Sequence, residues 1–241
     1  MLLNNDFAPV TEAVGCVRAP LATTCEAYLA WMQGVLAEYE QEITGVSVDG
    51  ELRRLFSMLP PLTAPVPTRE LFLQLGDGWT AFFDNFKLGS DPAGKVAVLS
   101  GRLQTTGLRL TIVSDTLGAH VLGQKKGTYG ATIFEAFEGS RHARRSIACA
   151  NDGGRWVFEQ AGSPYGFEDL ACYERKRISD RFPPELLERY AREFGADAFS
   201  DVAYLDQNRQ AHGVLFERIG TLPKSPTYIS LADARRARGI R

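Results

Sequence analysis

Apolar and polar side chains alternate with a period of two along several stretches of this chain, which is the pattern of half-buried β-strands. The clearest case is an apolar run that ends at Asp152-Gly153-Gly154 and returns as an aromatic strand. These turn residues tolerate the positive φ angles that a tight hairpin requires. Trp156 and Phe158 then share one face of the returning strand. The pattern therefore predicts a β-hairpin over residues 144–162.

A second hairpin with a similar signature is predicted over residues 70–86. Its turn is Gly76-Asp77-Gly78, and the strand after the turn begins at Trp79 and is rich in phenylalanine. In both hairpins a Gly/Asp turn precedes a tryptophan, further aromatic residues and an acidic residue. Two explanations stay open, namely an internal duplication in one sheet and the common use of Asp and Gly in turns before aromatic strands.

Apolar residues at helical spacing predict helices among these strands. The first is expected to begin at Thr23, because a glutamate three residues later completes a capping box. Another is expected to follow Asp91-Pro92, which suit an N-cap and a first-turn proline. A further helix is predicted over residues 184–194, ended by Gly195. Residues 1–22 have no regular period and are expected to form an irregular lead-in.

Strands in hairpins with interspersed helices predict an α+β fold, with a mainly antiparallel β-sheet built from hairpins and helices packed on it. A length of 241 residues fits a single domain over residues 1–241. The alternative is a subdivision at the proline-rich connector 60–67. In that case residues 1–59 would form a helical N-terminal part and residues 68–241 the part that contains the sheet.

The composition is that of an ordinary globular protein, with 44% hydrophobic and 23% charged residues. A net charge of −2 provides no general attraction to nucleic acid or to an anionic membrane. The N-terminus has neither a basic region nor a long apolar core, and no apolar run reaches the length of a membrane span. These features predict a cytoplasmic protein that does not interact with membranes.

Metal and cofactor sites are not expected. None of the four cysteines lies in a Cys-x-x-Cys pair, and the three histidines are scattered. Asp84, Asn85 and Asp91 form a loose set of oxygen ligands, but their spacing does not match a calcium-binding loop. The sequence also lacks the nucleophile-elbow, zinc-protease, phosphate-loop and dinucleotide-binding motifs. Its chemistry, if any, would be of an unfamiliar kind.

The densest group of charged side chains lies between residues 168 and 181. An arginine-rich pocket for a carboxylate or a phosphate could form around Glu168, Arg175 and Arg177, because a guanidinium group binds either anion in a bidentate manner. The alternative is an ion-pair network that holds the segment against the sheet, since its acids and bases could satisfy each other. A basic region at residues 141–145 and the four arginines of the C-terminal tail would be the groups available to nucleic acid, a partner that the net charge of −2 does not favour.

Several motifs between residues 78 and 182 resemble those of a family of uncharacterised bacterial proteins. They read GWTAFFDN at 78–85, YGATIFE at 129–135, NDGGRWVF at 151–158, FEDLACYERK at 167–176 and DRF at 180–182. Small α+β proteins of this build include immunity proteins that neutralise toxins of neighbouring bacteria. The resemblance therefore implies an immunity-type inhibitor, and it transfers no catalytic residue.

The leading hypothesis is a non-enzymatic cytoplasmic binding protein with a protein partner, as in an immunity-type inhibitor. Its binding surface would combine hairpin aromatics with the charged segment, because aromatic and arginine residues are enriched at protein interfaces. The expected surface residues are Trp156, Phe158, Glu168, Tyr173, Arg175, Arg177, Asp180 and Arg181. The first alternative is an enzyme or small-ligand binder with the anionic pocket described above. The further alternative is a nucleic-acid-associated protein.

Overall fold

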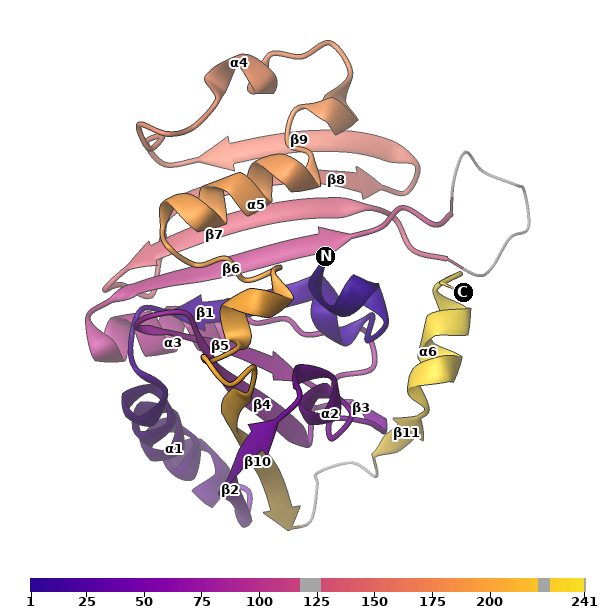
Figure 1. Ribbon diagram of the computed structural model, residues 1–241. Coiled ribbons are helices and arrows are strands. Elements are labelled where there is room, and N and C mark those ends of the chain that lie inside the picture. The colour runs from indigo at the N-terminus through magenta and orange to yellow at the C-terminus, as the bar shows by residue number, and fades with distance from the viewer. Residues whose placement is uncertain (118–126, 221–225, 241) are drawn as a thin grey trace.

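The computed structural model describes residues 1–117, 127–220 and 226–240, which form an antiparallel sheet with helices packed on both faces (Figure 1). The α+β fold with a mainly antiparallel sheet is thus confirmed. The helices are α1 (Leu21–Ala37), α2 (Leu52–Phe56), α3 (Ala93–Leu103), α4 (Leu170–Tyr173), α5 (Pro184–Glu193) and α6 (Leu231–Ala237). The strands are β1 (Ala13–Val17), β2 (Gln41–Gly50), β3 (Leu62–Ala64), β4 (Arg69–Leu75), β5 (Trp79–Asp84), β6 (Thr106–Val113), β7 (Ala131–Glu138), β8 (Ala143–Asp152), β9 (Arg155–Ala161), β10 (Ala211–Gly220) and β11 (Thr227–Ile229). No helix within these ranges is long and apolar enough to cross a lipid bilayer.

Nine strands form one sheet in the order β2-β10-β4-β5-β1-β6-β7-β8-β9, with every neighbouring pair antiparallel. Strands β3 and β11 pair separately. Both predicted hairpins therefore lie in the same sheet, where β1, β6 and β7 separate them. The β8–β9 turn is the predicted one, with Gly153 at φ 63° and Gly154 at φ 103°. Glycine adopts such angles without the steric cost that a Cβ atom would add.

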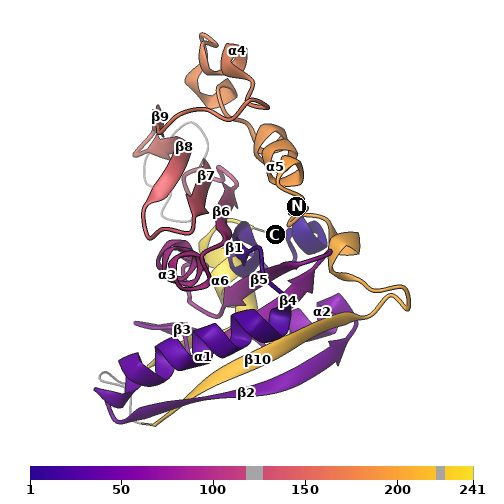
Figure 2. The ribbon, with the colours of Figure 1, turned by 90° about the vertical axis from the view of Figure 1, so that its left-hand side faces the viewer.

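Two hydrophobic cores lie on opposite faces of the sheet, because successive side chains of a strand point to opposite sides. In β4, Phe72 packs in the core beneath α1 and α3, whereas Leu71 and Leu73 belong to the core on the other face. Figure 2 shows α1 running along β10 and β4 on one side of the sheet, and α5 on the other side of β6 and β7. The sheet is thus the middle layer of the molecule.

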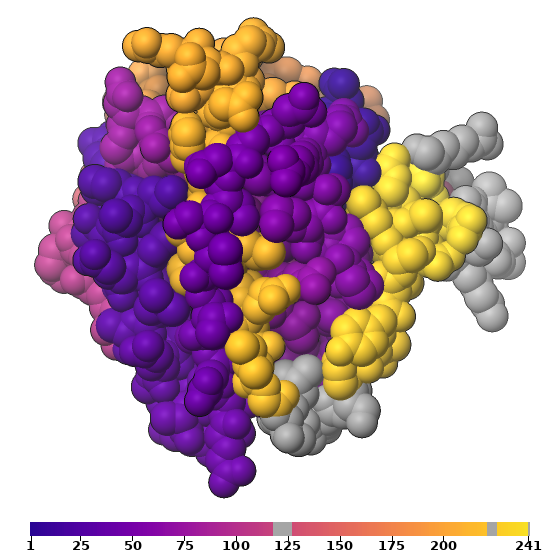
Figure 3. All heavy atoms as spheres, turned by 60° about the horizontal axis from the view of Figure 1, so that its bottom comes forward, coloured from indigo at the N-terminus to yellow at the C-terminus, as the bar shows by residue number. Residues whose placement is uncertain are grey.

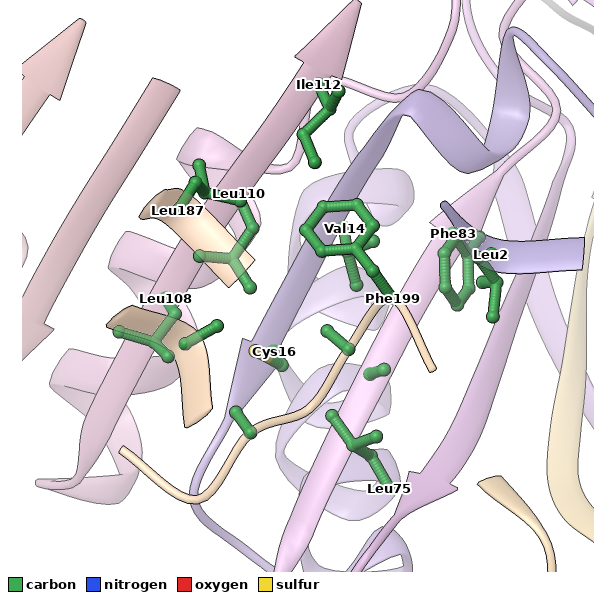
Figure 4. Packing of buried hydrophobic residues seen from close by; sticks show 14 of the residues in the cluster. Leu2, Val14, Cys16, Leu75, Phe83, Leu108, Leu110, Ile112, Leu187 and Phe199 are labelled. Carbon is green, nitrogen blue, oxygen red and sulfur yellow. The ribbon is translucent and has the colours of Figure 1, made fainter. Parts of the chain in front are cut away.

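The larger core is closed by α5 and by the segment that follows it. Figure 4 shows Leu187 of α5 over Leu108 and Leu110 of β6, with Val14 of β1 and Phe199 nearby. Burying a side chain such as that of Leu187, which is fully inaccessible to solvent, stabilises a fold by about 1.5–3 kcal/mol. These contacts hold α5 against the sheet.

The expectation of an irregular lead-in over residues 1–22 is wrong for β1. This strand lies in the middle of the sheet between β5 and β6, and all five of its residues are buried. A short strand that is buried on both faces shows no apolar–polar alternation, so the period of two could not reveal it.

The proline-rich connector does not separate a helical part from the sheet. Residues 1–59 contribute β1 to the middle of the sheet and β2 to one of its edges. The connector itself contains β3, which pairs with β11 near the C-terminus. Figure 3 shows the C-terminal segment (yellow) lying against the part of the molecule that contains β3. The sheet therefore draws its strands from both sides of the connector.

The predicted helices are present; α5 begins at Pro184 as predicted, whereas the first residues of α1 and α3 differ from the prediction. Helix α1 begins at Leu21, and no side chain caps its N-terminus, so the capping box at Thr23 is wrong. Thr24 instead donates its hydroxyl to the Pro20 carbonyl oxygen at 3.0 Å. The end of α5 is as predicted, because Gly195 has a φ of 81° at the position after the helix.

Candidate functional site

Two residues of the expected binding surface, Glu168 and Tyr173, lie in the interior. Glu168 receives three hydrogen bonds from Arg145 of β8, of 2.6–3.2 Å, and the Arg145 side chain is only 1% exposed. The Tyr173 hydroxyl donates to Glu168 Oε2 at 2.9 Å. The backbone N–H of Tyr165 donates to Glu168 Oε1 at 2.9 Å. This network joins the α4 segment to the sheet, and its carboxylate is not available to a ligand.

The four charged residues Arg175, Arg177, Asp180 and Arg181 of the expected surface contact one another. Arg175 donates to the Asp180 carbonyl oxygen at 3.1 Å, and Arg181 donates to the Arg175 carbonyl oxygen at 2.9 Å. Arg177 is 79% exposed and lies 3.8 Å from the Asp180 carboxylate. The anionic pocket expected around Glu168, Arg175 and Arg177 is therefore not formed, because the carboxylate is buried with Arg145 while Arg177 faces solvent.

Trp156 and Phe158 lie on β9, the strand at one edge of the sheet, and both are half-buried. The Phe158 ring packs against Tyr173 at 5.3 Å between ring centroids, and the Arg181 guanidinium lies over the Phe158 ring at 5.8 Å from its centroid. The structure thus brings Phe158, Tyr173 and Arg181 together, largely in a packing role.

The arginines considered for nucleic acid do not form a free basic patch. Arg145 is buried, and Arg144 pairs with Glu138 at 3.1 Å. In the C-terminal tail, Arg238 pairs with the buried Glu12, and Arg236 pairs with Asp233. Arg241 lies outside the described residues. Most of the positive charge on which this alternative depended is compensated within the fold.

A different group of charged side chains lies under α1 and α3, on the face of β4, β5 and β10 that otherwise carries phenylalanines. Glu70 of β4 and Asp84 of β5 are register partners, so their side chains emerge side by side on the same face. Arg218 projects from β10 and Lys95 from α3. We call Glu70, Asp84, Lys95 and Arg218 the charged cluster. Like charges opposite each other destabilise a sheet, which is why the two cations matter here.

Each anion of the charged cluster is compensated. Lys95 Nζ donates to Glu70 Oε2 and also to Asp84 Oδ2, the latter at 3.1 Å. Arg218 donates to Glu70 Oε1 at 3.2 Å. The backbone N–H of Phe86 donates to Asp84 Oδ1 at 3.1 Å. All four carboxylate oxygens therefore accept at least one hydrogen bond.

The electrostatics of the charged cluster favour its ionised form. Burial by itself would raise the pKa of Glu70, which is 2% exposed, but the charges of Lys95 and Arg218 hold that pKa below its usual value. Burial would likewise lower the pKa of Lys95, but the charges of Glu70 and Asp84 raise it. The lowered pKa of Glu70 and the raised pKa of Lys95 thus both favour the ionised form of this pair.

A cavity of about 260 Å³ lies beside the charged cluster. Its walls are apolar and consist of Trp31, Met32, Pro65, Pro67 and Phe86. Apolar walls with a few converging polar groups are typical of small-molecule sites, although most such sites are somewhat larger, at about 300–1,000 Å³. The cavity is therefore of a size for a small ligand.

Two polar atoms next to this cavity lack a hydrogen-bond partner among the described residues, namely the Tyr28 hydroxyl and Arg218 Nε. Tyr28 is fully buried and held between Phe72 and Phe216, at ring-centroid distances of 4.7 and 4.9 Å. Its hydroxyl interacts with the Glu70 carboxylate, as the pKa values of both groups indicate, but does not form a hydrogen bond of normal geometry. Burial, and next the Glu70 charge, raise the pKa of Tyr28 well above 10. Buried polar groups are nearly always paired, so two unpaired ones at one place call for an explanation.

Sequence reasoning missed this cavity. The available signal was that Glu70 and Asp84 occupy buried positions of aromatic strands, but no pattern connected them with Lys95 or Arg218. Asp84 had been grouped with Asn85 and Asp91 as oxygen ligands. Within the described ranges, no group of three or more His, Cys, Asp or Glu side chains is arranged to hold a metal ion. Asn85 Oδ1 instead accepts hydrogen bonds from the backbone N–H groups of residues 68 and 69, and it thereby holds the end of the connector in place.

Comparisons of the chain with protein-family models, with curated proteins and with solved structures gave no match. The family resemblance of residues 78–182 accordingly stays a prediction, and the site has to be interpreted from its own geometry.

Proposed function

We propose that this chain is a non-enzymatic binding protein that holds a small ligand in the cavity between α1, α3 and the β4–β5–β10 face of the sheet. The observation that carries the proposal is the pair of unpartnered polar atoms, Tyr28 Oη and Arg218 Nε, beside an apolar-walled cavity. A ligand with an apolar body and a polar end would cover the walls and supply the missing partner.

The charged cluster supports binding over proton-transfer chemistry. A general acid or base works best when its pKa lies near the working pH. Here the pKa of Glu70 is lowered, while the pKa values of Lys95 and Tyr28 are raised. These groups are thus moved away from neutral pH, and each keeps one protonation state there. Fixed charges orient a ligand, but they do not exchange protons with it.

The three tryptophans provide a direct test, because only Trp31 is among the residues that line this cavity. We would label the indole nitrogens with ¹⁵N and record spectra while adding small fragments that combine an aromatic or aliphatic body with one polar group. Binding in the cavity should shift the Trp31 indole resonance and leave those of Trp79 and Trp156 in place. A fragment screen in which no compound shifts Trp31 selectively would refute the proposal.

A matched pair of variants completes this test. Trp31→Ala removes a cavity wall and should weaken the fragments that bind by tenfold or more, since burying a large aromatic surface is worth about 1.5–3 kcal/mol. Trp156→Ala removes a half-buried tryptophan from β9 and should leave their affinity unchanged. Equal losses in both variants would indicate a general loss of stability and would argue against the cavity.

A protein partner at the β9 edge is a second candidate, as expected for an immunity-type inhibitor. It is supported by the exposed Arg177, which precedes the turn at Ile178–Asp180 that contacts β9, and by the half-buried Trp156 and Phe158 on this edge strand. A stoichiometric partner isolated from the native host should be lost on Arg177→Glu. It should be retained on Arg102→Glu, which changes an exposed arginine at the end of α3. Retention of the partner by both variants would exclude this surface.

A further inference from the structure

The polar atoms that lack a partner at the cavity include a guanidinium N–H and a phenol hydroxyl. Arg218 Nε can only donate a hydrogen bond, and the Tyr28 hydroxyl can donate one. Each of the four oxygens of Glu70 and Asp84 already accepts a hydrogen bond, and none is placed to accept one from Arg218 Nε. What these two donors lack is therefore an acceptor placed to complete a hydrogen bond of normal geometry.

The charges at the cavity leave no excess of either sign. Glu70 and Asp84 are matched by Lys95 and Arg218, and Asp91 at the rim pairs with Arg109 at 3.3 Å. A ligand carboxylate would add a further anion beside two buried carboxylates, and a ligand ammonium would find those carboxylates already occupied. Burying a charge without a partner costs several kcal/mol, so either ion would bind poorly.

From this balance we infer that the ligand is a neutral molecule whose polar end is an acceptor oxygen, such as an amide or ketone carbonyl, on a small apolar body. The inference rests on the proposed function of the cavity and specifies its ligand class. The carbonyl oxygen would accept from Arg218 Nε and Tyr28 Oη, while the body would lie against Trp31, Pro65 and Phe86.

Access to the two donor atoms involves a small movement of side chains. Both atoms are shielded from solvent in the unliganded protein, and Met32 of α1 lies among the lining residues at 5% exposure. Methionine is unbranched and changes rotamer readily, and rotamer changes are common on binding. Among the apolar residues that line the cavity, Met32 is therefore the one whose side chain changes position most readily.

Three probes of nearly equal size separate the alternatives: 3-phenylpropanamide (neutral), 3-phenylpropanoate (anionic) and 3-phenylpropylamine (cationic). Each would be titrated into the full-length protein, with affinity measured by the shift of the Trp31 indole resonance. The amide should bind at least tenfold more tightly than either ion, because each ion lacks a free partner of opposite charge.

Variants of the two donors test the same point. Tyr28→Phe removes only the hydroxyl and should weaken the amide by about three- to tenfold, while the protein stays folded because no hydrogen bond of normal geometry is lost. Tyr39→Phe is the matched control, because Tyr39 follows α1 but is 55% exposed. Arg218→Lys keeps the charge next to Glu70, lacks Nε, and should weaken the amide similarly.

The outcomes are distinct. A preference for the amide that Tyr28→Phe and Arg218→Lys both reduce, with Tyr39→Phe unchanged, would support the inference. Tighter or equal binding of the carboxylate or the amine at Trp31 would overturn the ligand class while the cavity remained a binding site. If none of the three probes shifted Trp31 at millimolar concentration, both the ligand class and the proposed function would be overturned.

Discussion

Glu70 and Asp84 face each other across β4 and β5, and the ammonium group of Lys95 bridges the two carboxylates from α3. This arrangement places two like charges side by side within an aromatic core, next to Phe72 and Phe82. The fold accommodates these two carboxylates only because cations from two other elements, Lys95 of α3 and Arg218 of β10, neutralise them. The stability of the sheet centre therefore depends on residues of α3 and β10.

Lys95→Met should destabilise the protein by about 3–5 kcal/mol at neutral pH, because it leaves two buried carboxylates with insufficient compensation. The folded-state pKa of Glu70 is lowered below 4.5, so the native protein gains stability from this group above that pH and loses it as pH falls through the folded value. The loss of unfolding free energy in the variant, relative to the unchanged protein, should therefore become smaller in acid. Urea denaturation at neutral pH and below pH 4.5 measures this, with the exposed Lys87→Met as control. If the variant lost the same unfolding free energy at both pH values, the proposed role of Lys95 in compensating the two carboxylates would be wrong.

Arg145→Met should cost about 3–5 kcal/mol, because Arg145 is the cation paired with the buried Glu168 and its removal leaves that carboxylate without a cation. The neighbouring Arg144→Met removes a partly exposed pair with Glu138 and should cost no more than about 1 kcal/mol. Thermal or chemical unfolding of the two variants compares a buried and a surface ion pair on the same strand. Similar losses would show that the burial of Arg145 does not matter energetically.

His212 should make the stability of the protein depend on pH, because its ring contacts two carboxylates. Hydrogen bonds with Asp206 at 3.1 Å and with Asp49 at 2.6 Å raise the pKa of His212 above 6.5. A raised folded-state pKa contributes stability that is fully present below pH 6.5 and is lost as pH rises through the folded value. His212→Gln should remove this part of the pH dependence, whereas His142→Gln, at an exposed position, should preserve it. An NMR titration of His212 at or below 6.5 would disprove the prediction.

Two glycines should respond to alanine in opposite directions. A Cβ atom at Gly15 of β1 would come within 2.2 Å of the Phe82 ring, so Gly15→Ala should cost about 1–3 kcal/mol through overpacking. A Cβ atom at Gly34 of α1 meets nothing within 4 Å, so Gly34→Ala should stabilise the helix by about 0.5–1 kcal/mol. Melting temperatures of the two variants test both statements. A destabilising Gly34→Ala would show that the glycine has another role.

Much of the sheet could be predicted from the chain because its cause is local. The alternation in β6, β7 and β10 identifies strands, and the glycines at 153 and 154 determine where one hairpin turns. The strand β1 escaped notice since burial on both faces removes the alternation. Local patterns also do not show which strands become neighbours. The connector at 60–67 was therefore a candidate domain boundary, although strands from before and after it belong to one sheet.

The partners of the charged residues were decided by the tertiary structure alone. From the sequence, the acids and bases of 168–181 could be expected to meet, yet Glu168 pairs with Arg145, 23 residues away. Glu70 pairs with Arg218 across 148 residues because β10 lies next to β4. By itself the sequence determined where strands, turns and helices form, since these follow from side-chain periodicity and backbone preferences. The order and register of the strands determined the site, because only they set which distant side chains share one face of the sheet.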